Sequence, residues 1–214
     1  GYPLEENVGG VWQQYMNGST QYHFQGVLFT DGGIANLGGP TRTNPNDPDT
    51  AAPAIASFAQ LTVAATGRVL VTRDLKYESP TCSSKADWNG GNVVRAVCNE
   101  TTTKNVLGVY AQKGDMLFGT GDSDTPPELT AHGAFMSSEG RVGVYNWNSV
   151  VNTKTSLNIT GGLIGNVVAG FAWGSGGYRR SVTYDPRMGA GTPDRSMMIS
   201  RESLVKIFPR SASI

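Results

Sequence analysis

The residues best suited to chemistry lie together near the C-terminal end of the chain, where arginines alternate with tyrosines. This segment holds Tyr178, Arg179, Arg180, Tyr184 and Arg187. An arginine guanidinium neutralises a phosphate, and a tyrosine ring stacks on a nucleobase. The pattern therefore predicts that these five residues contact DNA.

The same segment also permits a structural role. Tyr184, Asp185 and Pro186 have the composition of a turn, because proline fixes φ and aspartate bonds to nearby backbone N–H groups. In this interpretation the turn is the corner that ends the fold, and an arginine pairs with Asp185. Both interpretations stay open on the sequence alone.

The distribution of charge is uneven although the net charge is zero. Residues 178–214 carry 7 Lys and Arg against 3 Asp and Glu, whereas residues 1–177 carry 10 against 14. A basic bias of this kind is typical of a surface that binds a polyanion. The alternative is a solvated surface whose charges are balanced.

Acidic and nucleophilic residues do not form a recognisable catalytic pattern. A β-helical enzyme that cleaves polysaccharide needs clustered carboxylates as acid and base, and no acidic pair recurs at matching positions of the chain. Gly-x-Ser-x-Gly, a phosphate-binding loop and His-Glu-x-x-His are also absent from the sequence. We therefore predict that the protein is not an enzyme, and we expect His23 and His132 to be structural.

A metal site is not predicted either. Asp47 and Asp49 lack the glycine and glutamate of a calcium-binding EF-hand loop, so we interpret them as turn formers. A second acidic group matches no ligand spacing, although it places four acidic residues in 14 positions: Asp115, Asp122, Asp124 and Glu128. The chain has two histidines and no Cys-x-x-Cys, which argues against zinc. We expect no cofactor.

The two cysteines, Cys82 and Cys98, lie in one polar segment rich in glycine and asparagine. We predict that they form a disulfide and that 92–97 is one arm of a hairpin held by it. A disulfide implies an oxidising, extracytoplasmic setting. The alternative is a pair of free cysteines in a cytosolic loop.

These residues must be positioned by a short sequence repeat that occurs five times. Each copy consists of an apolar strand, a glycine and a second short strand. An apolar residue follows each glycine by two places, at Ile34, Val69, Met116, Val142 and Leu163. A unit that cannot bury its own face stacks on copies of itself, and glycine permits a tight corner between strands. We predict an all-β fold, a β-solenoid of β-helix-like coils with loops inserted at the coil corners.

Composition supports this fold class, since the chain has 28 glycines among 214 residues and only 16% charged residues. We expect a single domain. Residues 1–23 are an N-terminal cap or lead-in, with a short helix or an irregular cap over 11–16. Residues 24–188 are the solenoid, with inserted loops at 40–53 and 78–104, and 189–214 are a C-terminal strand or tail. Apolar runs are too short for a transmembrane helix, and we expect any export signal to be removed or to lie upstream.

Four stretches resemble a known family: 26–32, 61–75, 131–136 and 178–188. The most specific is Gly-Tyr-x-x-x-x-x-Tyr-Asp-Pro-Arg, from Gly177 to Arg187. These stretches are similar to the ComZ-like large minor pilins of the type IV pilus and competence system, which carry a β-solenoid inserted in a pilin-like fold.

The resemblance implies an extracellular, non-enzymatic module near a pilus tip, with incoming DNA and other pilins as partners. A pilin begins with a cleavage site and a long apolar helix, and this chain has neither. We therefore expect it to be the solenoid portion alone, or a relative with another anchor.

Three functions follow as hypotheses. The first is pilus-associated DNA capture, which a contiguous positive face would favour. The second is a structural spacer or adhesin that binds protein or glycan, in which the arginines only close the fold; a neutral, aromatic-rich face would favour it. The third is a polysaccharide-active enzyme, which would require carboxylates converging in a groove.

Overall fold

The structure is a computed structural model that describes residues 26–83, 96–119, 126–148, 156–172 and 177–188 in full. It also describes the backbone of the strand residues 5–8, 11–14, 16–17, 20–21, 87–89, 92–94, 153–155, 173 and 176. The described residues form strands and two short 3-10 turns, η1 (Pro48–Thr50) and η2 (Pro186–Met188), with no α-helix among them. The prediction of an all-β fold is therefore confirmed for the described residues.

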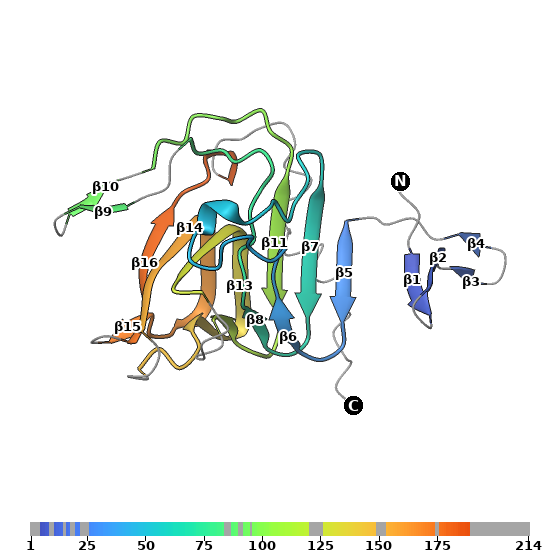
Figure 1. The fold of residues 1–214 in the computed structure, drawn as a ribbon. Coiled ribbons are helices and arrows are strands. Elements are labelled where there is room, and N and C mark those ends of the chain that lie inside the picture. The colour runs from blue at the N-terminus through green and yellow to red at the C-terminus, as the bar shows by residue number, and fades with distance from the viewer. Residues whose placement is uncertain are drawn as a thin grey trace.

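The main sheet is built from parallel strands that stack in sequence order (Figure 1). Their side chains form columns, because each strand pairs in register with the next. Leu28, Val63, Val109, Phe135 and Leu163 make up one such column. The strands of this ladder are β5 (Val27–Thr30), β7 (Gln60–Ala65), β11 (Val106–Ala111), β13 (Glu128–Val144), β14 (Thr153–Val168) and β16 (Gly176–Thr183).

A second parallel ladder runs beside the first. It contains β6 (Ile34–Leu37), β8 (Val69–Val71), β12 (Met116–Phe118) and the second halves of β13 and β14. Its column confirms four of the five repeat positions, since Ile34 pairs with Val69, Val69 with Met116 and Met116 with Val142. The next residue in the column is Val168.

The fifth repeat position was therefore predicted wrongly. Leu163 pairs with Phe135 in the first ladder, and Gly161 pairs with Gly133 instead of Gly140. Both glycines adopt positive φ, +140° at Gly161 and +143° at Gly133, and a Cβ on Gly161 would lie only 2.0 Å from the Gly133 carbonyl oxygen. Gly161 is thus needed at a different corner, where two backbones approach closely.

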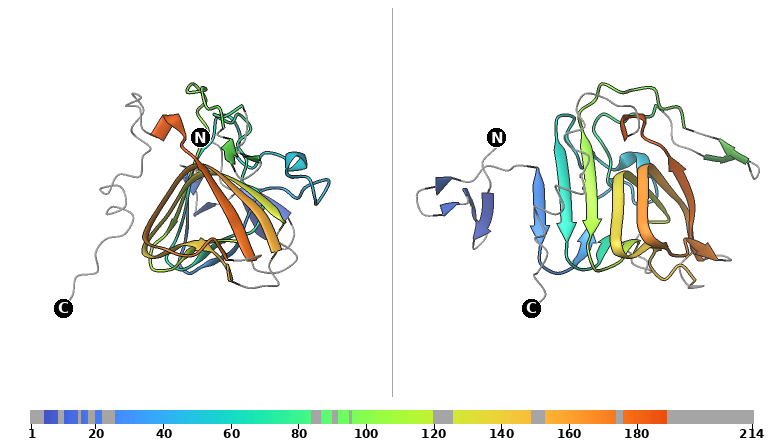
Figure 2. Two further views of the ribbon diagram at one scale, coloured as in Figure 1. Left: turned by 90° about the vertical axis from the view of Figure 1, so that its left-hand side faces the viewer. Right: turned by 180° about the vertical axis from the view of Figure 1, so that it is seen from behind.

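The third side is closed by shorter pairings. Ile55 bridges Tyr77 and Leu75 bridges Ala131, both in parallel. The sheet is thereby nearly closed into a barrel-like shape, with a roughly triangular outline when viewed end-on (Figure 2, left).

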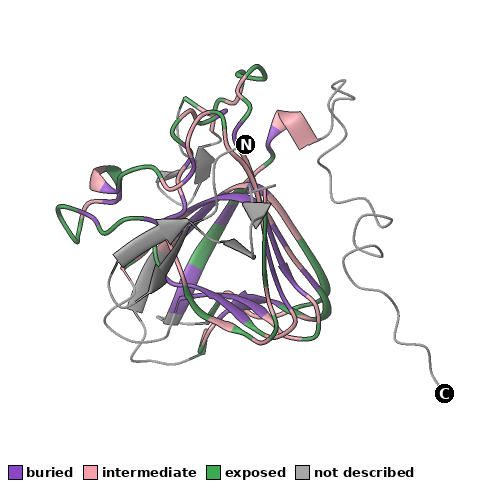
Figure 3. Cartoon of the chain, turned by 90° about the vertical axis from the view of Figure 1, so that its right-hand side faces the viewer, coloured by how far each residue is buried: buried purple, intermediate pink, exposed green. Residues whose placement is uncertain are grey.

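The core fills the inside of this barrel. Buried residues line the inner surface of the described strands (Figure 3), and the rings of Phe118 and Phe135 meet edge to face at 5.1 Å. Burial of these side chains is the main stabilising contribution, at roughly 25 cal/mol per Å² of apolar surface. The largest fully buried side chains of the core are Tyr178, Phe118, Phe135, Leu107, Met116, Leu129, Leu157 and Ile159.

The N-terminal segment forms two separate hairpins: β1 (Glu5–Val8) with β2 (Val11–Gln14), and β3 (Met16–Asn17) with β4 (Thr20–Gln21). The short helix that we considered for 11–16 is therefore wrong, because β2 and β3 occupy that stretch. The predicted C-terminal strand or tail, 189–214, lies outside the described residues.

The two predicted inserted loops contain few regular elements. Loop 40–53 contains η1, and the Asp47 carboxylate accepts a hydrogen bond from the Asp49 N–H, which confirms Asp47 as a turn former. Loop 78–104 contains the antiparallel hairpin of β9 (Asp87–Asn89) and β10 (Asn92–Val94), which extends away from the barrel (Figure 1). A last short strand, β15 (Ala172–Trp173), pairs antiparallel with the start of β16.

Candidate functional site

Tyr178 belongs to the core. Its exposed fraction is 0%, and its hydroxyl donates a hydrogen bond of 2.7 Å to the Pro126 carbonyl. Burial raises the pKa of this phenol well above its usual range. The prediction that Tyr178 stacks on a base is therefore corrected, since its ring has no exposed face.

Arg187 is also part of the fold. Its Nη2 lies 2.6 Å from Asp185 Oδ2, and the two side chains are 8% and 1% exposed. Its Nη1 donates to the backbone carbonyls of Thr103 and Asn105, at 3.1 and 2.7 Å. Because these groups occupy the guanidinium, Arg187 is corrected from a phosphate contact to a structural residue. The alternative that an arginine pairs with Asp185 at this corner is confirmed.

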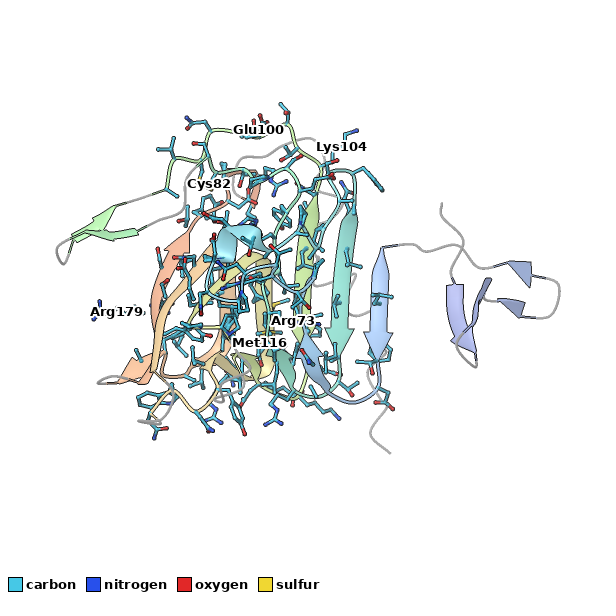
Figure 4. All side chains as sticks on the ribbon, viewed as in Figure 1. Arg73, Cys82, Glu100, Lys104, Met116 and Arg179 are labelled. Carbon is cyan, nitrogen blue, oxygen red and sulfur yellow. A yellow bond between two sulfur atoms is a disulfide. The ribbon has the colours of Figure 1, made fainter. Side chains whose placement is uncertain are left out.

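Arg179, Arg180 and Tyr184 remain exposed. Arg179 extends from β16 at the margin of the molecule (Figure 4), and Tyr184 is 58% exposed. Within the described part of the chain, no salt bridge is formed by either arginine. These three residues are the part of the predicted DNA-binding set that solvent can reach.

The register of β16 explains why its side chains differ. Arg180 pairs with Leu157 of β14, whose side chain points into the core. Arg180 therefore lies over the C-terminal end of the core, and its guanidinium carbon is 4.5 Å from the centroid of the Phe171 ring, a cation–π distance. Arg179, one residue earlier, points to the opposite face of the strand.

Asp115, one of the acidic residues considered as metal ligands, forms an ion pair with Arg141 instead. Its carboxylate lies 2.9 Å from Arg141 Nη2 and accepts the Arg141 backbone N–H at 2.8 Å. Burial alone would raise the pKa of Asp115, but the hydrogen bonds and charge of Arg141 outweigh burial and lower it. Asp122 and Asp124 lie outside the described residues. In the described part of the chain, no three His, Cys, Asp or Glu side chains form a group able to hold a metal.

His132 has the structural role that we expected. Its Nδ1 accepts the backbone N–H of Tyr77 at 3.1 Å, and the two rings meet edge to face at 5.2 Å. Burial, with a smaller contribution from the positive charge of Lys76, lowers the pKa of His132 from 6.5 to about 4. The ring is therefore neutral at pH 7. His23 lies outside the described residues.

Sequence reasoning missed a buried ion pair between Arg42 and Asp74. Arg42 Nε donates to Asp74 Oδ2 at 2.7 Å, and Arg42 Nη2 donates to the Glu128 carbonyl at 2.7 Å. Asp74 Oδ1 also accepts the Thr130 N–H. This pair ties the loop at 40–53 to the barrel. No local signal could have found it, because the partners are 32 residues apart and Arg42 lies in a turn-rich loop.

The predicted disulfide between Cys82 and Cys98 is formed. Ser83 N–H donates to the Val97 carbonyl at 2.9 Å just inside it, so the disulfide closes the base of the β9–β10 hairpin as predicted. A disulfide indicates an oxidising, extracytoplasmic environment. The described residues include no helix long and apolar enough to cross a bilayer.

A cavity of about 310 Å³ opens at the β5 end of the barrel. The described residues that line it include no carboxylate. Its lining includes Leu28, Leu37, Ile55, Leu61, Val63 and Leu107.

Comparison of the chain with protein-family models, with curated proteins and with solved structures gave no match.

Proposed function

We propose that this chain is a β-solenoid module displayed outside the cytoplasm, on a pilus or the cell surface, that binds DNA through Arg179, Arg180 and Tyr184. The in-register parallel columns support the assignment of stacked coils, because each strand repeats the position of the one before it. The disulfide supports the location. The similarity to large minor pilins supports the pilus and makes other pilins the expected protein partners.

One observation carries the DNA proposal: two adjacent exposed arginines have no acidic partner among the described residues, and the exposed Tyr184 follows just after the end of the same strand. The two guanidinium groups can each neutralise a phosphate. Tyr184 offers a ring for stacking on an unpaired base. The opposite directions of Arg179 and Arg180 suit a strand margin that DNA straddles.

The proposal is tested by measuring DNA binding across a salt series for the wild type and for Arg179→Ala/Arg180→Ala. If both arginines contact phosphates, the slope of log K against log salt becomes shallower by about 1.8 in the variant, since each lost phosphate contact reduces it by about 0.9. Arg187 is left intact, because its loss would disturb the fold.

The matched control is Lys104→Ala/Lys113→Ala, which removes the same charge from two other exposed positions. An unchanged slope in the control and a shallower slope in the arginine variant support the interface. Equal changes in both variants would show nonspecific attraction and contradict the assignment of the site. Absence of wild-type binding at low salt would reject the DNA proposal.

The second candidate is a non-enzymatic spacer or adhesin. The observation that favours it is that Tyr178, Asp185 and Arg187, from the most specific stretch of the sequence, are occupied in holding the fold together. In this case Arg180 only covers the end of the core beside Phe171. Wild-type protein that fails to bind DNA but binds a pilin subunit or a glycan would support this function.

A further inference from the structure

The outer edge of β14 is uncovered at the C-terminal end of the barrel. Strand β16 pairs with β14 only as far as Thr160, and nothing else that the structure describes pairs with that edge beyond this point. The five consecutive residues 164–168 are all exposed, and Val168 reaches 69%. An exposed apolar edge strand is a template for another strand.

This edge lacks two of the usual protections against strand pairing, although its pairing with β13 has a register shift between Gly165 and Val167. Natural edges carry charged residues, prolines or inward-pointing charges, whereas residues 157–170 include no charged residue and no proline. The neighbouring edge strand β16 differs, because it carries Arg179 and Arg180. The uncharged half of β14 is therefore suited to receiving a strand.

The described chain ends beside this edge. A Cβ placed on Gly162 would lie 4.0 Å from the Sδ atom of Met188, the last described residue, so the Met188 side chain reaches β14 where its uncovered part begins. A segment of the same chain has a high effective concentration at such a site.

One segment after Met188 has the composition of a strand. Leu204, Val205, Ile207 and Phe208 are all strand-forming or apolar residues, and Pro209 ends the run. The 14 residues between, 189–202, could span up to about 46 Å if extended. That reach is far greater than the length of the uncovered edge, so the connection imposes no strain.

We propose that residues 203–209 add a strand to the β14 edge at Gly162–Val168 and cover its exposed apolar side chains. Added hydrogen bonds from the backbone give affinity in this mode of recognition, and alternate side chains give specificity. The occupant is a segment of the same chain, so the protein remains a monomer. The proposal is independent of DNA binding.

Hydrogen exchange of the full chain tests the proposal. Ile207→Pro removes one donor and blocks strand pairing, so the edge-directed amides of residues 163–168 should exchange at least about 10-fold faster than in the wild type. Ser213→Pro is the matched control and should leave these amides unchanged. Equal exchange in wild type and Ile207→Pro would overturn the proposal.

A second experiment identifies the occupant. A chain that ends at Glu202 should lose the protection of 163–168, and a synthetic peptide of residues 203–209 should restore it. Asn166→Cys/Lys206→Cys should form a cross-link within a monomer. Protection that disappears on dilution, or a cross-link found only in dimers, would show that a second copy covers the edge and would overturn the proposal.

Discussion

The segment from Tyr178 to Arg187 divides into two regions with the same residue types and opposite environments. The Arg187 side chain is only 8% exposed, is paired with Asp185 and donates to two backbone carbonyls. Arg179 and Arg180 are exposed and make no salt bridge within the described chain. Tyr178 lies in the core, whereas Tyr184 lies at the surface.

An arginine–tyrosine pattern therefore does not by itself define a ligand site. A guanidinium taken out of water must find acceptors, and Arg187 finds them in Asp185 and the segment 103–105. A side chain that remains in water keeps its donors available for a ligand. The same comparison predicts which substitutions damage the fold and which damage only binding.

The largest effect is expected for Arg187→Ala. Removal of one partner leaves the Asp185 carboxylate buried without its counter-charge, which should cost about 3–5 kcal/mol of unfolding free energy. Urea denaturation measures the loss, and Arg187→Ala/Asp185→Asn should recover part of it. A loss as small as that of Arg179→Ala would remove the distinction between the two regions.

The next effect is a dependence of stability on pH through His132. Its folded pKa of about 4 lies below its usual value of 6.5, so below pH 6.5 the unfolded state binds more protons than the folded state. The stabilisation is complete above pH 6.5 and is lost as pH falls towards 4, by up to about 1.4 kcal/mol per pH unit.

His132→Asn should flatten this part of the profile, because an amide oxygen can accept the Tyr77 N–H without binding a proton. Unfolding curves measured from pH 7 to pH 4 test the expectation. An equal slope in wild type and variant would assign the acid sensitivity to another group.

A smaller effect is expected for Tyr178→Phe, which removes the hydrogen bond to the Pro126 carbonyl but keeps the ring. The cost should be about 1 kcal/mol. Tyr184→Phe is the paired control and should change stability by less than about 0.5 kcal/mol, since its side chain is exposed. Thermal unfolding of both variants makes the comparison, and equal costs would contradict the burial difference.

The smallest effect on stability is expected for Arg179→Ala and Arg180→Ala, each within about 0.5 kcal/mol. Arg180→Ala should cost more than Arg179→Ala because it also loses the contact with Phe171. Chemical denaturation of the single variants measures the order. The reverse order would show that the outer face of β16 carries a stabilising contact.

Much of the fold could be predicted from local patterns. Glycine followed two residues later by an apolar side chain marked four members of one column, Ile34, Val69, Met116 and Val142. The pattern failed at Leu163, because Gly161 meets the same sequence description but turns a different corner, beside Gly133. The local sequence predicts that the chain turns at such a glycine, but it does not predict at which corner of the barrel the turn lies.

The candidate site could be predicted only in part. Asp185 and Arg187 are two residues apart, so their pairing was among the alternatives that the sequence raised. The carbonyls that Arg187 also contacts are 82 and 84 residues away, and the Arg42–Asp74 pair spans 32 residues. Such contacts depend on how the strands stack, which no local pattern records.

Local patterns in the sequence predicted an all-β fold, glycines between its short strands and a disulfide between its two cysteines. These properties depend on backbone freedom, side-chain alternation and cysteine chemistry, all of which act over a few residues or a single loop. Which arginines and tyrosines face water depends on the tertiary structure. That choice depends on the position of β16 at the end of the barrel, where the core stops and each side chain either finds a buried partner or stays in solvent.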